Sequence, residues 1–160
     1  MLSIFPGIGL LDRGFELEGF TVVRGPDLIW GGDVHSFHPP AAVFDGIIGG
    51  PPCQTFSPIG NVNRARYGDA SVMPDLIPEF ARIVTETMPS WYVMENSPHA
   101  YAPFPDSRRI ILDNAWLGEP QARKRAFWSN LALHVQTPVF VHPNPEPTVT
   151  SCGGVDWKGS

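Results

Sequence analysis

The sequence predicts an α/β fold of Rossmann-like type, in which helices cover both faces of a mostly parallel sheet. Short apolar runs alternate with segments whose apolar residues recur at helical spacing, and this alternation is typical of parallel sheets. One run, Ala42–Ile48, is almost continuously apolar, as expected for a strand buried on both faces. Polar residues follow several of these runs directly, and open α/β sheets bind ligands at the carboxyl ends of their strands.

The expected elements follow one another along the chain. Leu2–Phe5 is predicted to be a buried strand, and the apolar spacing from Leu10 to Leu17 predicts a helix after it. A shared apolar face predicts a second helix over Met73–Met88, with Pro78 near its first turn. The other expected strands are Phe20–Val23, Leu28–Trp30, Ala42–Ile48, Trp91–Met94, Ile110–Leu112 and Ala126–Trp128, the last in a hairpin with Leu131–Val135.

Length and composition fit one domain with a core of its own. The chain has 160 residues, of which 42% are hydrophobic and 17% are charged, and this excludes a disordered acidic tail. No apolar run approaches the roughly 20 residues that a membrane-spanning helix needs. Met1–Phe5 lacks the features of a signal peptide. We therefore expect a cytoplasmic protein without a membrane partner.

The net charge of −5 is unusual for a nucleic-acid binder, but the basic residues are unevenly distributed. No acidic residue occurs from Pro51 to Tyr67, and seven of the eleven basic residues fall into three clusters. These clusters are Arg64 and Arg66, Arg108 and Arg109, and Arg123, Lys124 and Arg125. Each cluster is either a contact for nucleic acid or a solvated face.

Pro6–Gly9 forms a glycine-containing turn between the first strand and the first helix. Such a turn lets backbone N–H groups approach a ligand closely. The pattern is not a full GxGxxG, because Asp12 stands where the third glycine would be. An ordinary strand-to-helix turn explains the segment as well as a ligand site does.

Gly49–Gln54 (GGPPCQ) follows the expected central strand and places Cys53 on a stiff loop. The glycines free the backbone, and the prolines restrict it immediately before the thiol. A nucleophile needs such fixed placement, and a buried structural cysteine is the alternative. His35 and His38 do not have a common zinc spacing, and Cys53 has no neighbouring cysteine, so we expect no metal. Cys152 is the other cysteine, and we expect free thiols.

Two further polar segments adjoin apolar strands. Glu95 follows Trp91–Met94 directly, and partial burial there would raise the pKa of its carboxyl and favour the protonated form. A helix cap is the alternative role for Glu95. In an extended segment, Gln121, Arg123 and Arg125 would point to one face, where two guanidinium groups suit a phosphate and a base carbonyl. A solvated strand edge is the alternative.

These segments, taken in order, resemble the motifs of DNA cytosine-5 methyltransferases. The matching segments are Phe5–Gly9 (FPGIG), Asp33 in GDV, Gly50–Ser57 (GPPCQTFS), Glu95–Asn96 (EN), Gln121–Arg125 (QARKR) and, more weakly, Glu146–Thr150 (EPTVT). The resemblance covers residues 1 to about 130 well and the rest weakly. The GPPCQ loop is its most specific part.

The resemblance implies an S-adenosylmethionine-dependent methyltransferase fold and the chemistry of that family. A cysteine thiolate adds to carbon-6 of a cytosine in DNA, and carbon-5 then takes the methyl group. Carried over, Cys53 would be the nucleophile, and Glu95 would engage nitrogen-3 and the exocyclic amine of the base. Arg125 would hold the base oxygen, and Arg123 would support the loop or a phosphate. The cytosine must be flipped out of the duplex or already single-stranded.

The resemblance also implies a cofactor site for S-adenosylmethionine. Its expected residues are Phe5, Gly7, Gly9, Asp33 and Pro52. Asp33 would meet the adenine amine. Asp27 is the only nearby acidic candidate for the ribose hydroxyls, although it follows Gly25 and Pro26 rather than a strand directly.

Departures from the family pattern define the domain organisation and the alternatives. Leu10 replaces a second consecutive glycine, and Ser97 replaces a commonly apolar residue. About fifteen residues separate Asn130 from Glu146, where relatives insert a target-recognition domain, and the family's last motif is not found. We expect a catalytic and cofactor-binding domain over 1–135 and a Pro/Gly-rich tail over 136–160. A weak or inactive module that needs a partner chain, and a DNA-binding or DNA-mimicking protein without chemistry, are the alternatives.

Overall fold

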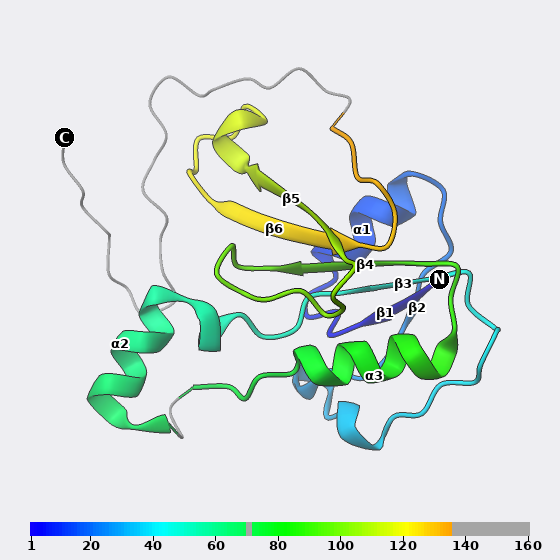
Figure 1. Cartoon of the computed structure of the whole chain (residues 1–160), viewed down its shortest axis with the longest axis horizontal. Coiled ribbons are helices and arrows are strands. Elements are labelled where there is room, and N and C mark those ends of the chain that lie inside the picture. Colours follow the sequence, from blue (N-terminus) through cyan, green and yellow to red (C-terminus); the bar gives the residue numbers. More distant parts are fainter. Residues whose placement is uncertain (70–71, 136–160) are drawn as a thin grey trace.

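The computed structural model describes residues 1–69 and 72–135, which form an α/β domain around one six-stranded sheet (Figure 1). The strands are β1 (Leu2–Ile4), β2 (Val23–Arg24), β3 (Gly46–Gly49), β4 (Trp91–Asn96), β5 (Arg108–Asp113) and β6 (Lys124–Ser129). Their order across the sheet is β2-β1-β3-β4-β6-β5. The pairs among β2, β1, β3 and β4 are parallel, whereas β6 runs antiparallel to both β4 and β5. The expected mostly parallel sheet is confirmed.

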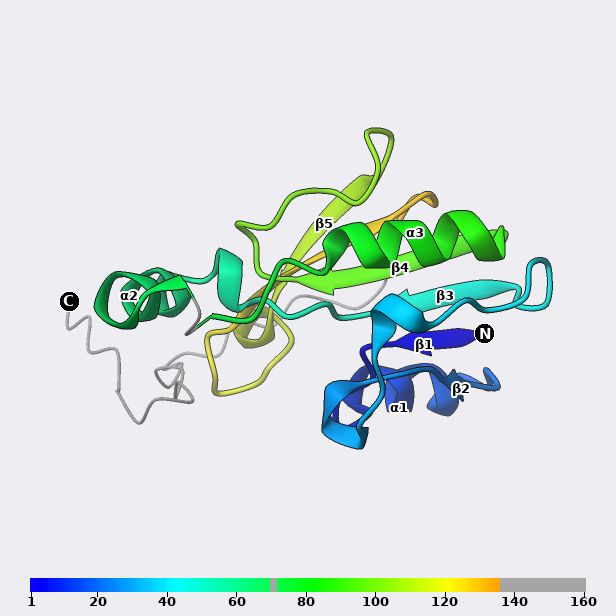
Figure 2. The same ribbon diagram turned by 90° about the horizontal axis from the view of Figure 1, so that it is seen from below.

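The helices are α1 (Leu10–Leu17), α2 (Pro58–Tyr67) and α3 (Ile77–Thr87), and α1 and α3 lie on opposite faces of the sheet (Figure 2). Neighbouring side chains of β4 point to opposite faces and contact one helix each. Trp91 stacks on Phe15 of α1, with ring centroids 6.1 Å apart. Tyr92 packs edge-on against Phe80 of α3 at 6.0 Å. Helices therefore cover both faces, as the sequence predicts.

Four of the expected strands are wrong in type or extent. The run Ala42–Ile48 contributes only Gly46–Ile48 to β3. Leu28–Trp30 is a short 3-10 helix, η1, because the Asp27 side chain caps it by accepting from the Ile29 amide, and its exposed apolar side chains gain nothing from a sheet. Phe20–Val23 contributes only Val23 to β2. Leu131–Val135 forms no strand, because β6 already has β4 and β5 as partners on its two sides.

The helix boundaries also differ from the expectation. Residues 73–76 precede α3 rather than belong to it: Leu76 is the residue before the helix, and Asp75 accepts from the Ile77 amide in a local turn. Helix α2 was not expected, since its sequence PIGNVNRARY has no apolar stripe. It begins because Ser57 accepts from the Gly60 amide at 3.1 Å and proline occupies its first position.

Within residues 1–69 and 72–135, no helix is long and apolar enough to cross a membrane. The expected tail over 136–160 and the expected Glu146–Thr150 motif lie outside the described residues.

The contact between Gly46 and Trp91 generates the first prediction. A Cβ atom at Gly46 would lie 2.2 Å from the Trp91 ring, so Gly46→Ala must displace the ring that holds α1. We expect it to lower the free energy of unfolding by about 1–3 kcal/mol. Gly14→Ala is the control, because nothing lies within 4 Å of its added methyl and alanine favours a helix. Urea unfolding measures both variants, and a neutral Gly46→Ala would contradict a fixed Trp91.

Candidate active site at the carboxyl edge of the sheet

The loop that carries Cys53 leaves the carboxyl end of β3 and is anchored from β4. Asn96, the last residue of β4, is fully buried and donates from its Nδ2 to the carbonyl oxygen of Pro51 at 3.0 Å. Its Oδ1 accepts from the Ser97 amide at 2.7 Å. Cys53 is a half-buried free thiol that directly precedes the 3-10 helix η3 (Gln54–Phe56). The backbone that carries the thiol is therefore anchored by a buried hydrogen bond at Pro51, two residues before Cys53.

A second anchor lies just beyond the thiol. Gln54 accepts from the Met73 amide through Oε1 at 3.2 Å, and Thr55 donates from Oγ1 to the Met73 carbonyl at 2.6 Å. These bonds join the residues before α2, Gln54 and Thr55, to Met73, which follows α2 in the sequence. The Cys53 loop is thus fixed by Asn96 of β4 before the thiol and by the backbone of Met73, which precedes α3, after it.

Glu95 lies beside this loop and forms an ion pair with β6. Because β4 and β6 are antiparallel and Glu95 is opposite Phe127, Arg125 reaches Glu95 from two residues away on the same face. The Nε of Arg125 lies 2.7 Å from the Oε1 of Glu95. A Cβ atom at Gly50 would lie 3.2 Å from the other carboxyl oxygen, so only glycine leaves that oxygen its present space.

Burial and charge compete at this cluster. Burial raises the pKa of Glu95, and the nearby guanidinium groups of Arg125 and Arg123 lower it without cancelling the rise. Burial and the neighbouring Arg125 lower the pKa of Arg123, whereas Glu95 and Cys53 act in the opposite direction. The raised pKa of Glu95 is confirmed, although Glu95 lies within β4 and not after it. The structure thus brings together all the residues expected to be catalytic: Cys53, Glu95, Arg123 and Arg125.

A cavity of about 750 Å³ is bordered by Gly50, Pro52 and Gln54 of the Cys53 loop. Its lining includes four of the expected cofactor residues, namely Phe5, Gly7, Asp33 and Pro52. Gly9 does not line this cavity. It is the residue before α1 and borders an adjoining cavity of about 360 Å³, together with Gly7, Arg24 and Trp30.

Two aspartates at this cavity each fix a short helix. Asp27 accepts from the Gly7 amide through Oδ2 at 2.8 Å and from the Ile29 amide through Oδ1 at 2.9 Å. Asp33 accepts from the His35 amide through Oδ1 at 2.9 Å and precedes η2 (Val34–Ser36). Asp27 therefore links the Pro6–Gly9 turn to η1, and residues of both segments line the cavity.

Asp12 departs from the GxGxxG pattern, and Ser97 and Leu10 depart from the family pattern; the first two have buried polar partners. Asp12, in place of a third glycine, is a fully buried carboxylate that accepts from Ser3 at 2.5 Å and pairs with Arg24 at 2.7 Å. Ser97 is buried, and its hydroxyl donates to the Phe56 carbonyl at 3.3 Å. Leu10 is an exposed first residue of α1.

Sequence reasoning missed Asn96 as an anchor and Met73 as the closing point of the loop. The signal for Asn96 was its place after Glu95 at the end of a buried strand, where a polar side chain must find partners. No local pattern identifies Met73, because its bonds use the backbone only. Among the described residues, no group of three or more potential metal-ligating side chains occurs.

Comparison with known proteins gives the family. A family model described as C-5 cytosine-specific DNA methylase matches residues 31–103. Type II methyltransferase M.HgiDI of Herpetosiphon aurantiacus is 30% identical over 160 aligned residues, which cover 79% of this chain and 50% of the relative. M.HgiGI of the same organism is 31% identical over 120 residues, covering 62% of this chain and 90% of that relative. The chain belongs to the DNA cytosine-5 methyltransferase family.

Solved structures support the fold. A putative DNA modification methyltransferase encoded within an Escherichia coli prophage aligns with a TM-score of 0.60 at 23% identity, covering 89% of this chain and 51% of that chain. The Entamoeba histolytica methyltransferase EhMeth aligns with a TM-score of 0.56 at 14% identity, covering 89% and 56%. The chain spans half or less of the length of the first two curated relatives, at 50% and 40%.

The Asn96 anchor generates the second prediction. Asn96→Ala leaves the Pro51 carbonyl and the Ser97 amide without their partner, and we expect the free energy of unfolding to fall by about 2–4 kcal/mol. Asn61→Ala is the matched control, because Asn61 is exposed and accepts only from Arg64 within α2. We expect that control to stay within about 0.5 kcal/mol of wild type. Equal losses in the two variants would argue against the anchor.

The raised pKa of Glu95 generates a prediction for how the free energy of unfolding changes with pH. A carboxyl whose pKa is higher in the folded protein than in the unfolded chain stabilises fully below the unfolded pKa, and this contribution is lost as pH rises through the folded pKa. Glu95→Gln removes this titration. The free energy of unfolding of the variant relative to wild type should therefore rise as the pH increases above about 4, the ordinary range of a glutamate carboxyl.

Urea unfolding at several pH values measures this difference. Glu18→Gln, at the exposed end of α1, controls for the loss of one negative charge. A relative stability that falls with rising pH would show that the Arg125 ion pair outweighs burial.

Proposed function

We propose that this chain transfers a methyl group from S-adenosylmethionine to carbon-5 of cytosine in DNA, through a covalent intermediate on Cys53. The observation that carries the proposal is the convergence of a thiol, a partly desolvated carboxyl and two guanidinium groups beside a large cavity. Membership of the DNA cytosine-5 methyltransferase family supports both the reaction and the substrate class.

The cavity suits S-adenosylmethionine in size and chemistry. Its volume of about 750 Å³ lies within the roughly 300–1,000 Å³ typical of sites for small molecules. Asp33 would accept from the adenine amine, and Asp27 would accept from the ribose hydroxyls, because each carboxylate oxygen has a second lone pair. Phe5, Gly7 and Pro52 would contact the rest of the molecule, with Gly9 at its edge. When bound, the cofactor supplies an electrophilic methyl group.

The residues around Cys53 would activate the base. The thiolate of Cys53 bonds to carbon-6, and the electrons of the carbon-5–carbon-6 double bond move towards carbon-5. The protonated carboxyl of Glu95 holds a proton at nitrogen-3, so that negative charge does not build up on the ring. Arg125 would contact the base oxygen, and Arg123, which interacts electrostatically with Cys53, would support the loop or a phosphate.

The cycle ends by elimination. Transfer of the methyl group to carbon-5 would leave the electrons of the broken S–CH3 bond on the sulfur of S-adenosylhomocysteine, and a base would then remove the carbon-5 proton. The electrons of that C–H bond restore the double bond, and the Cys53 thiolate leaves carbon-6. The cytosine must leave a duplex stack to reach the thiol, because the groups that act on it converge from β3, β4 and β6.

We also propose that a second protein chain supplies target recognition. Reading bases in the major groove requires an element that reaches their edges. Only about fifteen residues lie between Asn130 and Glu146, where the resemblance places that element. The related alternative is a weak or inactive module that acts only with such a partner.

The covalent intermediate gives the decisive test. DNA that contains 5-fluorocytosine should trap Cys53, because the fluorine at carbon-5 cannot leave as a proton does. We expect an adduct that requires S-adenosylmethionine, disappears in Cys53→Ser and persists in Cys152→Ser. Mass spectrometry of the denatured complex measures it.

The outcomes separate the alternatives. An adduct in Cys53→Ser would move the nucleophile elsewhere. If the wild type binds cofactor and DNA but forms no adduct, the chain is the inactive module.

A further inference from the structure

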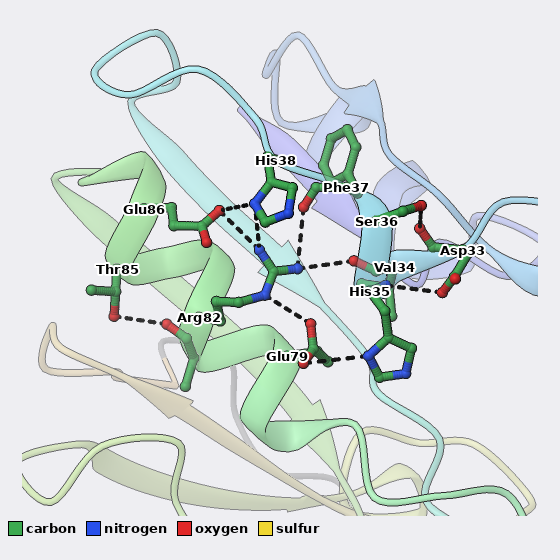
Figure 3. A network of polar contacts seen from close by, with 11 residues as sticks. Asp33, Val34, His35, Ser36, Phe37, His38, Glu79, Arg82, Thr85 and Glu86 are labelled. Atoms are coloured by element: carbon green, nitrogen blue, oxygen red, sulfur yellow. Dashed lines mark hydrogen bonds and ion pairs between the residues drawn. The ribbon is translucent and has the colours of Figure 1, made fainter.

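Arg82 of α3 lies at the centre of a polar network that joins this helix to the segment after Asp33 (Figure 3). Its neighbours on α3 orient it first. The Nε donates to Glu79 at 2.8 Å, and Nη1 donates to Glu86 at 2.9 Å. Because these carboxylates lie one turn away in each direction, they hold the guanidinium plane from both sides.

The remaining guanidinium nitrogen reaches across to η2. Nη2 donates to the Val34 carbonyl at 2.9 Å and to the Phe37 carbonyl at 3.1 Å. Val34 is the first residue of η2, and Phe37 follows its last residue, so one planar group grips both ends of the short helix. These contacts span more than forty residues of sequence.

The same carboxylates brace the histidines of this segment. His35 lies with its Nδ1 3.4 Å from Glu79, and His38 lies with its Nδ1 3.0 Å from Glu86. The Nδ1 of His38 is also 3.2 Å from Nη1 of Arg82. Burial lowers the pKa of Arg82, but its hydrogen bonds to Glu86 and Glu79 raise it by more. The net shift is upward, so the Arg82 guanidinium keeps its charge.

Asp33 is hydrogen-bonded to η2, the short helix that Arg82 contacts. Its Oδ1 accepts from the His35 amide at 2.9 Å, and its carbonyl accepts from the Ser36 hydroxyl at 3.1 Å. Asp33, Val34 and His35 all line the large cavity. A shift of η2 would therefore carry the Asp33 carboxylate with it.

We propose that Arg82 is a positioning residue that fixes the Asp33 carboxylate for the amino group of adenine. The inference rests on the proposed function, in which this cavity takes S-adenosylmethionine. Arg82 does not line the cavity and acts through η2. Lysine cannot replace it, because a single ammonium lacks the fork that bonds Glu79, Glu86 and two carbonyls together.

The test uses a pair of ligands that differ at one position of the base. S-adenosylhomocysteine carries the adenine amine, whereas its inosine counterpart carries a carbonyl oxygen in that place and cannot donate to Asp33 from that position. We expect the wild type to prefer the adenine form by about tenfold or more, the value of one hydrogen bond to a charged group. Calorimetry on the whole chain measures both affinities.

The variants are Arg82→Lys, Asp33→Asn and the double substitution. We expect Arg82→Lys to lose most of the preference by weakening the adenine form alone. Asp33→Asn should also lose it, because the amide can donate to the carbonyl oxygen of the inosine counterpart, and the double variant should lose no more than Asp33→Asn does. Arg13→Lys is the matched control, because Arg13 is an exposed helix arginine whose ion pair, at 3.7 Å, stays within α1. It should keep the wild-type preference.

Other results would overturn the inference. If Arg82→Lys keeps the preference while Asp33→Asn loses it, Arg82 does not position Asp33, and the cofactor assignment still stands. If Arg82→Lys weakens both ligands equally, or if the two effects add, its role is general stability. If Arg82→Lys does not fold, Glu86→Ala, which removes one brace, must lower the preference instead. If the wild type binds neither ligand, the cofactor assignment fails and the inference fails with it.

Discussion

The pairing of β4 with β3 on one side and with β6 on the other is the constraint on which the site depends. Gly49 lies opposite Met94, so the loop after β3 emerges beside Glu95. On the other side, the antiparallel register places Arg125 diagonally across from the same residue. A shift of either register by one residue would turn Glu95 away from one of its neighbours, because side chains alternate between faces.

Burial sets the chemistry that this register makes available. Glu95 is desolvated enough that its pKa is raised, although Arg125 is within ion-pair distance. An exposed pair would stay ionised, whereas a partly buried carboxyl keeps its proton to a higher pH. Asn96 contributes to the same balance, because its bond to Pro51 holds the Cys53 loop against the carboxyl. The anchor of the Cys53 loop and the raised pKa of Glu95 therefore have the same structural origin at the end of β4.

Local pattern predicted what is local, and contacts between distant segments escaped it. The apolar runs located β1, β3 and β4, and the glycine and proline signals located the Cys53 loop and the turn at Gly7. The run Leu28–Trp30 was wrongly predicted to be a strand, because its apolar pattern does not show that Asp27 caps a short helix there. The clamp of Arg82 on η2 was not foreseeable, because its partners are two backbone carbonyls that lie more than forty residues away.

One helix–strand unit holds both ends of the proposed reaction. At the cofactor end, α3 grips η2 through Arg82. In its middle, α3 packs on β4 through Phe80 and Tyr92. At its carboxyl end, β4 carries Glu95, which would face the cytosine, and Asn96, which anchors the Cys53 loop. Methyl transfer requires the reacting atoms to be held about 3–3.5 Å apart. Because the same packed pair carries the supports of both ligands, the core between α3 and β4 would determine that distance, and a change in the core would act on the rate without touching either ligand.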